Sequence, residues 1–389
     1  MKKIFKVIYR ELGLVRHNRT FSALALGLPI LAIVYFLLLF KTGVPTNLPI
    51  AVVDLDNSSL SKQFTRMIDA VPSVSIASMP KSTEEAEEMI RKGEIDAMLI
   101  IPREAEKDIY GNKPVTVPVF ISGLNITKNG LIQRDLSTAI ISFSTGIQVQ
   151  TLVSQGMSEA QAYQAAMPIN FERHILFNPY SSYSYYLLPI FFPMMMLIFI
   201  LLTAVFTFGS EFKNGTAKEW LETAGGNIYY AFAGKLFPYL ISFTILFVVA
   251  DIVLFKYIGI PLQGNRTLIL IANVLFVMAY QSLGVLIVVI SAGSLRRSLS
   301  VGGGYSVFAF TLSGYTFPLM AMNPLLQVLS YIFPMTYYMR IFVDQAVRGA
   351  PAFDTADQLV YFMIFILLPL LLLPRLRKMC TDNKYWGRM

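Results

Sequence analysis

The chain has 389 residues, of which 55% are hydrophobic and only 14% charged, and its mean hydropathy is +0.56. Soluble domains carry about 25% charged residues, so this composition excludes an ordinary soluble protein and indicates an integral membrane protein. The single cysteine, Cys380, excludes an internal disulfide. The two histidines, His17 and His174, lack the spacing of a metal site, and no metal is expected.

Six apolar runs approach the roughly 20 residues that a helix needs to cross a hydrocarbon core of about 30 Å. The expected fold class is therefore an α-helical polytopic membrane protein with six transmembrane helices. The predicted spans are 21–40, 187–209, 236–258, 267–292, 299–317 and 358–374.

The net charge of +8 is concentrated near the two ends of the chain. Residues 1–20 carry a net charge of +5 and the basic tail 375–389 a net charge of +4, whereas residues 47–183 carry 11 basic and 15 acidic side chains. Lys and Arg are enriched in the cytoplasmic segments that flank membrane spans. The distribution predicts that both termini are cytoplasmic and that the acidic segment lies outside, and it argues against a nucleic-acid partner.

The N-terminal residues 1–20 pattern as an amphipathic helix, with apolar side chains on one side and basic ones elsewhere. Such a helix is expected to lie along the inner membrane surface. The run 21–40 is expected to remain as an uncleaved first span, because its lead is long for a signal peptide and no small-residue cleavage site follows it.

Residues 41–186 are expected to form an extracytoplasmic α/β domain inserted between spans one and two. Short β-like runs alternate with helical ones, as in α/β units. Residues 126–167 carry no strand signal and predict one long helix, broken at Gly156. The predicted strands are 48–54, 74–78, 97–101 and 115–122, and the predicted helices before the long one are 58–70, 82–92 and 103–110.

The segment 187–389 is expected to hold spans two to six. A polar island at 209–235 interrupts its apolar runs with a short amphipathic helix that ends near Thr223. Span three contains Asp251, whose carboxylate is costly inside a membrane and should face protein or water. Pairing with Lys256 at the membrane interface and a transport role both remain open for Asp251. Asn273 and Gln281 in span four are candidates for hydrogen bonds between helices, and the three side chains are considered together as a membrane polar site.

The stretch 318–343 is apolar but punctuated by prolines, and it is too broken to span a membrane. It predicts a pair of short re-entrant or interfacial helices, which a membrane tolerates only where protein or water covers the backbone.

Taken together, these segments resemble the permeases of the ABC-2 type, the transmembrane subunits of type-2 ABC exporters, in the subgroup with a large extracytoplasmic domain between spans one and two. One part of the resemblance is the pattern Glu211-x-x-x-Gly215-Thr216, followed by a short helix and a return at Gly234-Lys235, which is similar to the cytoplasmic coupling segment of that family. The other part runs from Leu312-Ser313-Gly314 to Pro334-Met335-Thr336-Tyr337 and is similar to the outer re-entrant signature.

The resemblance implies a dimer in which each subunit engages a separate nucleotide-binding protein that holds ATP and Mg and hydrolyses ATP. This chain has no Gly-x-x-x-x-Gly-Lys-[Ser/Thr] pattern and no recognisable catalytic set, so it is not expected to be an enzyme or to hold a cofactor. The resemblance implies ATPase coupling by Glu211, Gly215, Thr216, Glu219, Trp220 and Gly225, and a re-entrant signature made of Gly314, Phe317, Pro318, Pro324, Pro334 and Tyr337.

The function expected is therefore an ATP-driven export permease in the inner membrane of a bacterium, moving an amphiphilic drug, lipid or glycoconjugate outward. The alternative is a membrane-anchored sensor or scaffold whose extracytoplasmic domain binds a ligand or partner. The sequence leaves open whether the dimer contains two copies of this chain or a similar second permease, and whether a periplasmic adaptor takes part.

Overall fold

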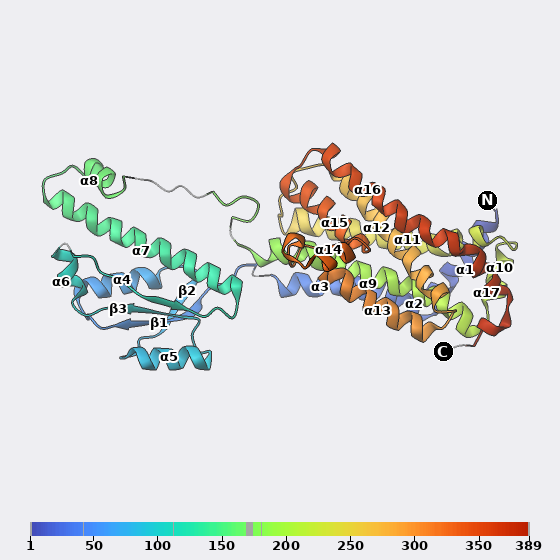
Figure 1. Ribbon diagram of the computed structural model, residues 1–389, viewed down its shortest axis with the longest axis horizontal. Coiled ribbons are helices and arrows are strands. Elements are labelled where there is room, and N and C mark those ends of the chain that lie inside the picture. The colour runs from blue at the N-terminus through green and yellow to red at the C-terminus, as the bar shows by residue number, and fades with distance from the viewer. Residues whose placement is uncertain (1, 42, 112, 169–173, 180, 388–389) are drawn as a thin grey trace. The chain divides into compact units, whose positions relative to one another are not determined.

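The computed structural model describes residues 2–41, 43–111, 113–168, 174–179 and 181–387, and divides the chain into two compact units (Figure 1). The helical unit comprises Met1–Lys41, Leu176–Asn178 and Ser182–Met389. The α/β unit comprises Thr42–Ile175 and Pro179–Ser181. Each unit has its own hydrophobic core.

The helical unit is a bundle of long apolar helices joined by short helical segments (Figure 1). The long helix α9 packs against both α12 and α13, and α12 also packs against α16. The elements are α1 Lys2–His17, α2 Arg19–Ser22, η1 Ala23–Gly27, α3 Leu28–Leu39, α9 Tyr183–Asn214, α10 Ala217–Thr223, α11 Ile228–Ile252, η2 Val253–Tyr257, α12 Arg266–Ile290, α13 Leu295–Thr311, η3 Leu319–Ala321, α14 Pro324–Ser330, α15 Pro334–Phe342, η4 Val343–Arg348, α16 Ala352–Leu367, η5 Leu368–Leu372, α17 Leu373–Thr381 and η6 Asn383–Tyr385.

Within the described residues, six helical segments are long and apolar enough to cross a membrane. Five overlap predicted spans one, two, three, four and six, and each begins before the predicted start: Arg19–Leu39, Tyr183–Asn214, Ile228–Tyr257, Arg266–Ile290 and Ala352–Thr381. The sixth, Ile126–Ser154, belongs to the α/β unit.

The predicted fifth span, 299–317, ends too late. Helix α13 has 17 residues and stops at Thr311, at the short limit for a membrane-spanning helix. The chain cannot continue as a helix because Gly314 has a φ of +81° and Pro318 follows it.

The predicted basic tail, 375–389, begins inside a helix. Span six continues through η5 into α17 and ends at Thr381.

The α/β unit is built on a four-stranded sheet with the order β2-β1-β3-β4. Strand β1 pairs in parallel with β2 and β3, and β4 is antiparallel to β3. The elements are β1 Leu48–Asp54, α4 Ser59–Asp69, β2 Val74–Ser78, α5 Thr83–Lys92, β3 Ala97–Ile101, α6 Ala105–Tyr110, β4 Val119–Ile121, α7 Ile126–Ser154 and α8 Glu159–Ala166.

The first three strands lie where the sequence predicts them, and the predicted break of the long helix is confirmed, since Gly156 has a φ of +97° between α7 and α8. The fourth strand is shorter than the predicted 115–122. Pro118 immediately before it cannot donate a ladder hydrogen bond, and the pairing with β3 begins at Val119.

Alternate side chains of β1 face two different layers, as the period of a strand requires. Ile50 and Val52 are buried with Phe64 of α4 and Leu131 of α7. Ala51 and Val53 face the other side, with Ala86 of α5. Figure 1 shows α4 and α7 on one face of the sheet and α5 on the other.

Candidate functional site

The predicted polar island 209–235 is largely helical. Helix α9 continues to Asn214 and α11 starts at Ile228, so the connection between them is residues 215–227 rather than 209–235. Gly215 ends α9 in a left-handed conformation with a φ of +72°, which favours glycine. Asn227 caps the start of α11 by accepting hydrogen bonds from the backbone N–H of Tyr229 and Tyr230 at 2.9 and 3.3 Å.

Beneath this connection lies a charge cluster made of Arg10, Glu11, Glu211 and Lys235. Arg10 holds Glu211 with both guanidinium nitrogens, at 2.5 and 2.9 Å. The ammonium of Lys235 donates to Glu11 Oε1 at 2.5 Å and to Glu211 Oε1 at 2.7 Å. The two anions balance the two cations, and the cluster ties α1, α9 and α11 together.

Three of the four side chains of the cluster are out of water, and Arg10 is half-buried. Lys235 and Glu11 are 0% exposed, and Glu211 is 3% exposed. Ions at that depth persist only when they are paired and hydrogen-bonded. Burial raises the pKa of Glu11, against the pull of Lys235 in the opposite direction. Burial alone would lower the pKa of Arg10, but its hydrogen bond and charge interaction with Glu211 raise it above the ordinary value.

Helix α10 is fixed to the cluster through Glu211. The hydroxyl of Thr216 donates to Glu211 Oε2, and the backbone N–H of Thr216 donates to the Glu211 carbonyl at 2.9 Å. Trp220 is fully buried, with its ring 5.3 Å from that of Phe208. The Lys235 ammonium lies 5.3 Å from the Trp220 ring centre, which is within the range of a cation–π contact. Trp220 therefore anchors α10 from inside and does not face a partner.

The outer side of α10 is polar. Lys218, Glu219 and Glu222 are exposed there, and the Lys218 ammonium lies 4.0 Å from Glu222. The Lys3 side chain passes over Gly225, since a Cβ at that position would come within 2.7 Å of Lys3 Nζ. Of the six residues expected to couple, Glu219 and Gly225 are exposed, Gly215 and Thr216 are half-buried, and Glu211 and Trp220 are buried.

The C-terminal segment braces the same connection. Helix α17 packs against α10, and the backbone N–H of Gly387 donates to the Phe212 carbonyl at 3.0 Å. Cys380 is buried in this layer. Up to Gly387, the C-terminal segment therefore packs against α9 and α10.

Arg10 and Lys235 were not predicted as partners of Glu211, and Glu11 was not predicted as the second carboxylate of the cluster. Two features of the sequence mark Glu11 and Lys235 as unusual. Glu11 is the only acidic residue among the first 20, and Lys235 begins an apolar run where a charge is costly. In α1, Val7 and Glu11 are buried against the helical unit, whereas Phe5 and Leu12 are exposed.

The re-entrant signature residues lie on two short helices, α14 and α15, and in the turn that precedes η3. Pro324 and Pro334 stand at the first turns of α14 and α15, where the missing N–H costs nothing. A Cβ on Gly314 would come within 2.6 Å of Leu319 Cγ, so this turn requires glycine. Phe317 is 52% exposed, and Pro318 precedes η3.

Helix α15 is the buried member of the pair and packs against α12 and α16. Tyr337 donates to the Tyr331 carbonyl at 3.1 Å, and its ring stacks on Tyr361 at 4.8 Å. Helix α14 leaves Leu325 and Val328 exposed.

Two of the three predicted membrane polar residues meet. Asn273 donates to Asp251 Oδ2 at 2.7 Å and accepts a hydrogen bond from the Tyr338 hydroxyl at 2.8 Å. Asp251 is therefore hydrogen-bonded to the Asn273 amide and not to Lys256, which is exposed. Gln281 is elsewhere, with its amide donating to the Leu236 carbonyl at 3.3 Å. The described residues contain no group of three or more His, Cys, Asp or Glu side chains that could hold a metal ion.

Comparisons with known proteins agree with one another. The family model described as "ABC-2 family transporter protein" matches residues 19–373. Two curated relatives, both named "Probable multidrug ABC transporter permease YbhS", come from Escherichia coli strain K12 and Escherichia coli O157:H7. Each is 19% identical to this chain over 315 residues, which cover 79% of this chain and 80% of the relative.

Proposed function

This chain belongs to the ABC-2 family of transporter proteins and is a multi-pass membrane permease, and we propose that it is the membrane subunit of an exporter driven by a separate ATPase. The substrate proposed is an amphiphilic, drug-like molecule, moved outward. The name of the E. coli relatives, a probable multidrug permease, supports this substrate class.

The observation that carries the proposal is the charge cluster beneath α10. A short helix with an exposed polar side is held from below by buried ion pairs that reach α1, α9 and α11. Elements connected in this way move as one body when a partner displaces the exposed helix. This is the mechanical property that an ATPase outside the membrane needs in order to act on the spans.

The orientation proposed places α1, α10 and α17 in the cytoplasm and the α/β unit outside, in a bacterial inner membrane. The support is the charge distribution, because residues 1–20 and 375–389 are strongly basic and 47–183 are net acidic. The cytoplasmic ATPase would then meet the Lys218, Glu219 and Glu222 side of α10.

A dimer of permease subunits, either two copies of this chain or this chain with a similar one, is part of the proposal. Several apolar side chains of the helical unit are exposed on its surface. Leu31 and Leu38 of α3 are 63% and 68% exposed, and Leu325 and Val328 of α14 are each 67% exposed. Lipid and a second subunit would bury them.

The test uses two matched charge reversals in the full chain co-expressed with its ATPase subunit. The double variant Glu219→Lys/Glu222→Lys reverses the exposed side of α10. The control, Glu87→Lys/Glu88→Lys, reverses two exposed glutamates on α5, where Glu88 also pairs with a lysine four residues away. Glu88 and Glu222 are both 65% exposed, so the two changes are equivalent for the fold.

We expect the α10 variant to lose about tenfold or more in ATPase co-purification, since like charges facing across an interface cost several kcal/mol. Substrate-stimulated ATP hydrolysis in proteoliposomes falls with it, and the α5 control keeps both. Unchanged co-purification and hydrolysis in the α10 variant would refute the assignment of this helix. Intact hydrolysis without efflux of any amphiphile would refute the export function instead.

A further inference from the structure

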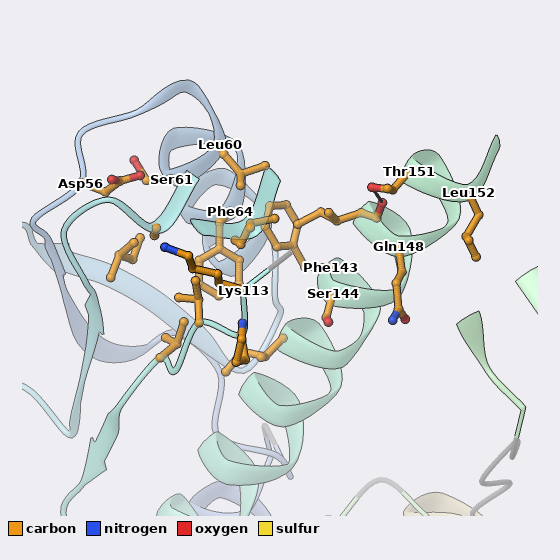
Figure 2. Close-up of a pocket in the computed structure, with 18 of the residues that line it drawn as sticks. Asp56, Leu60, Ser61, Phe64, Lys113, Phe143, Ser144, Gln148, Thr151 and Leu152 are labelled. Carbon is orange, nitrogen blue, oxygen red and sulfur yellow. Dashed lines mark hydrogen bonds between the residues drawn. The ribbon is translucent and has the colours of Figure 1, made fainter. Parts of the chain in front are cut away.

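The α/β unit contains a cleft of about 850 Å³ beside the second half of α7. The cleft lies between α7 on one side and α4, α6 and the segment 113–117 on the other (Figure 2). Ligand pockets typically measure about 300–1,000 Å³, so the cleft is large enough for a drug-sized molecule.

The cleft exists because only the first half of α7 packs on the sheet. Leu131, Ile132 and Leu136 are buried there. Beyond Ala139, the helix presents Ile140, Phe143 and Ile147 to the cleft at a spacing of three to four residues, and all three are only half-buried.

The interior of the cleft is aromatic and apolar. Phe143 packs against Phe64 of α4, with ring centres 4.9 Å apart, and Figure 2 shows these two rings in the middle of the cleft. Leu60 and Ile101 are buried beside them. The half-buried face of α7 therefore has protein on one side and space on the other, which favours an apolar occupant.

The charged groups at the cleft already have partners in this chain. Lys113 Nζ lies 3.5 Å from Asp108 Oδ1. Asp56 Oδ2 accepts a hydrogen bond from the backbone N–H of Glu106 at 3.2 Å. The other polar side chains that α7 presents to the cleft are uncharged, and Ser144 and Gln148 are exposed and line it, as does Gln155 just after the helix.

We propose that this cleft binds an uncharged amphiphile whose apolar body lies on Phe64, Phe143 and Ile147 and whose hydroxyl- or amide-bearing head bonds to Ser144 and Gln148, one helical turn apart on α7. Alkyl glycosides represent this chemistry. The cleft belongs to the α/β unit and its ligand binding does not depend on the proposed export function. The experiment therefore measures binding, and its result is independent of ATP hydrolysis and efflux.

The test uses the full chain in lipid nanodiscs and an octyl glucoside that carries a diazirine on its alkyl chain. After irradiation, the labelled residues are mapped by mass spectrometry. We expect labels within 140–152 of α7 and near Phe64 of α4. Unlabelled octyl glucoside should compete, whereas octyl sulfate and octyltrimethylammonium should compete at least about tenfold more weakly, since burying an uncompensated charge is costly.

Two serine variants on α7 provide the matched comparison. Ser144→Trp places an indole in the cleft, whereas Ser142→Trp places the same side chain on a residue that is exposed and does not line the cleft. Both positions are exposed in the same helix, so neither change disturbs the core. Labelling of the cleft should be lost in Ser144→Trp and retained in Ser142→Trp.

Three outcomes would overturn the proposal. The first is labelling that falls only on the helical unit, as lipid partitioning would give. The second is equal competition by charged and uncharged amphiphiles. The third is cleft labelling that survives Ser144→Trp unchanged.

Discussion

Replacing Lys235 by methionine should destabilise the helical unit strongly, because it removes one of the two cations of a buried, balanced cluster. Methionine has a similar length and keeps the apolar contacts of the lysine stem. Glu11, which is 0% exposed, then loses its 2.5 Å partner and keeps Arg10, at 3.2 Å from Glu11 Oε1, and the long hydrogen bond that Oε2 accepts from the Tyr239 hydroxyl at 3.5 Å. The cluster is left with a net buried negative charge.

The expected cost of breaking a buried pair in this way is about 3–5 kcal/mol. A loss of 1 kcal/mol lowers the Tm of a domain of about 150–250 residues by roughly 2–4 °C, so the Tm should fall by about 6–20 °C. The double variant Glu11→Gln/Lys235→Met restores the balance, since Arg10 and Glu211 remain as a bidentate pair. Its loss should be smaller than the sum of the two single losses by about 0.5–3 kcal/mol.

The assay is thermal unfolding of the purified full chain in one detergent, followed by near-ultraviolet circular dichroism. Lys218→Met is the control, because Lys218 is 60% exposed and its carboxylate partner is 4.0 Å away. It should change stability by no more than about 0.5 kcal/mol. The reasoning fails if Lys235→Met melts with the unchanged chain, or if the losses of Glu11→Gln and Lys235→Met simply add.

Gly314→Val should cost at least about 1–3 kcal/mol, because the residue has a φ of +81° and its new Cβ would stand 2.6 Å from Leu319 Cγ. Gly303→Ala should instead stabilise by about 0.5–1 kcal/mol, since Gly303 is helical and a Cβ there meets no heavy atom within 4 Å. Tyr338→Phe removes the hydroxyl that donates to the buried Asn273 at 2.8 Å, and should cost about 1–3 kcal/mol. Thermal unfolding measures the stability of all three variants. A change in stability opposite to the expected one would contradict the reason given for that variant.

Local patterns predicted much of the fold because the relevant physics is local. Strand β1 alternates between two buried faces, and Ser82 caps α5 by accepting from the Glu85 backbone at 3.3 Å, so both could be located from short windows. The errors arose where a backbone conformation decided the outcome. The end of α13 depends on Gly314 adopting a positive φ, and hydropathy does not report that.

The candidate site was predicted less completely because its partners are far apart in the chain. Glu211 could be singled out next to Gly215 and Thr216, but Lys235 is 24 residues away and Glu11 is 200 residues away. Only the packing of α1 against α11 brings Glu11 to Lys235. A Cβ on Gly234 would come within 2.8 Å of Val7 Cβ, so that close crossing also depends on a glycine.

The position of α1 in the cluster would extend the proposed coupling beyond the two spans that flank α10. Arg10 holds Glu211 directly, and α1 ends at His17, with a single residue between it and Arg19, where α2 and the first span begin. Asn18 in between caps α2 by accepting from the Thr20 backbone at 2.9 Å. A displacement of α10 would therefore reach the first span through Arg10, the second through Glu211 and the third through Lys235. Three spans would then respond to one docking surface, which a flexible loop between the second and third spans alone could not achieve.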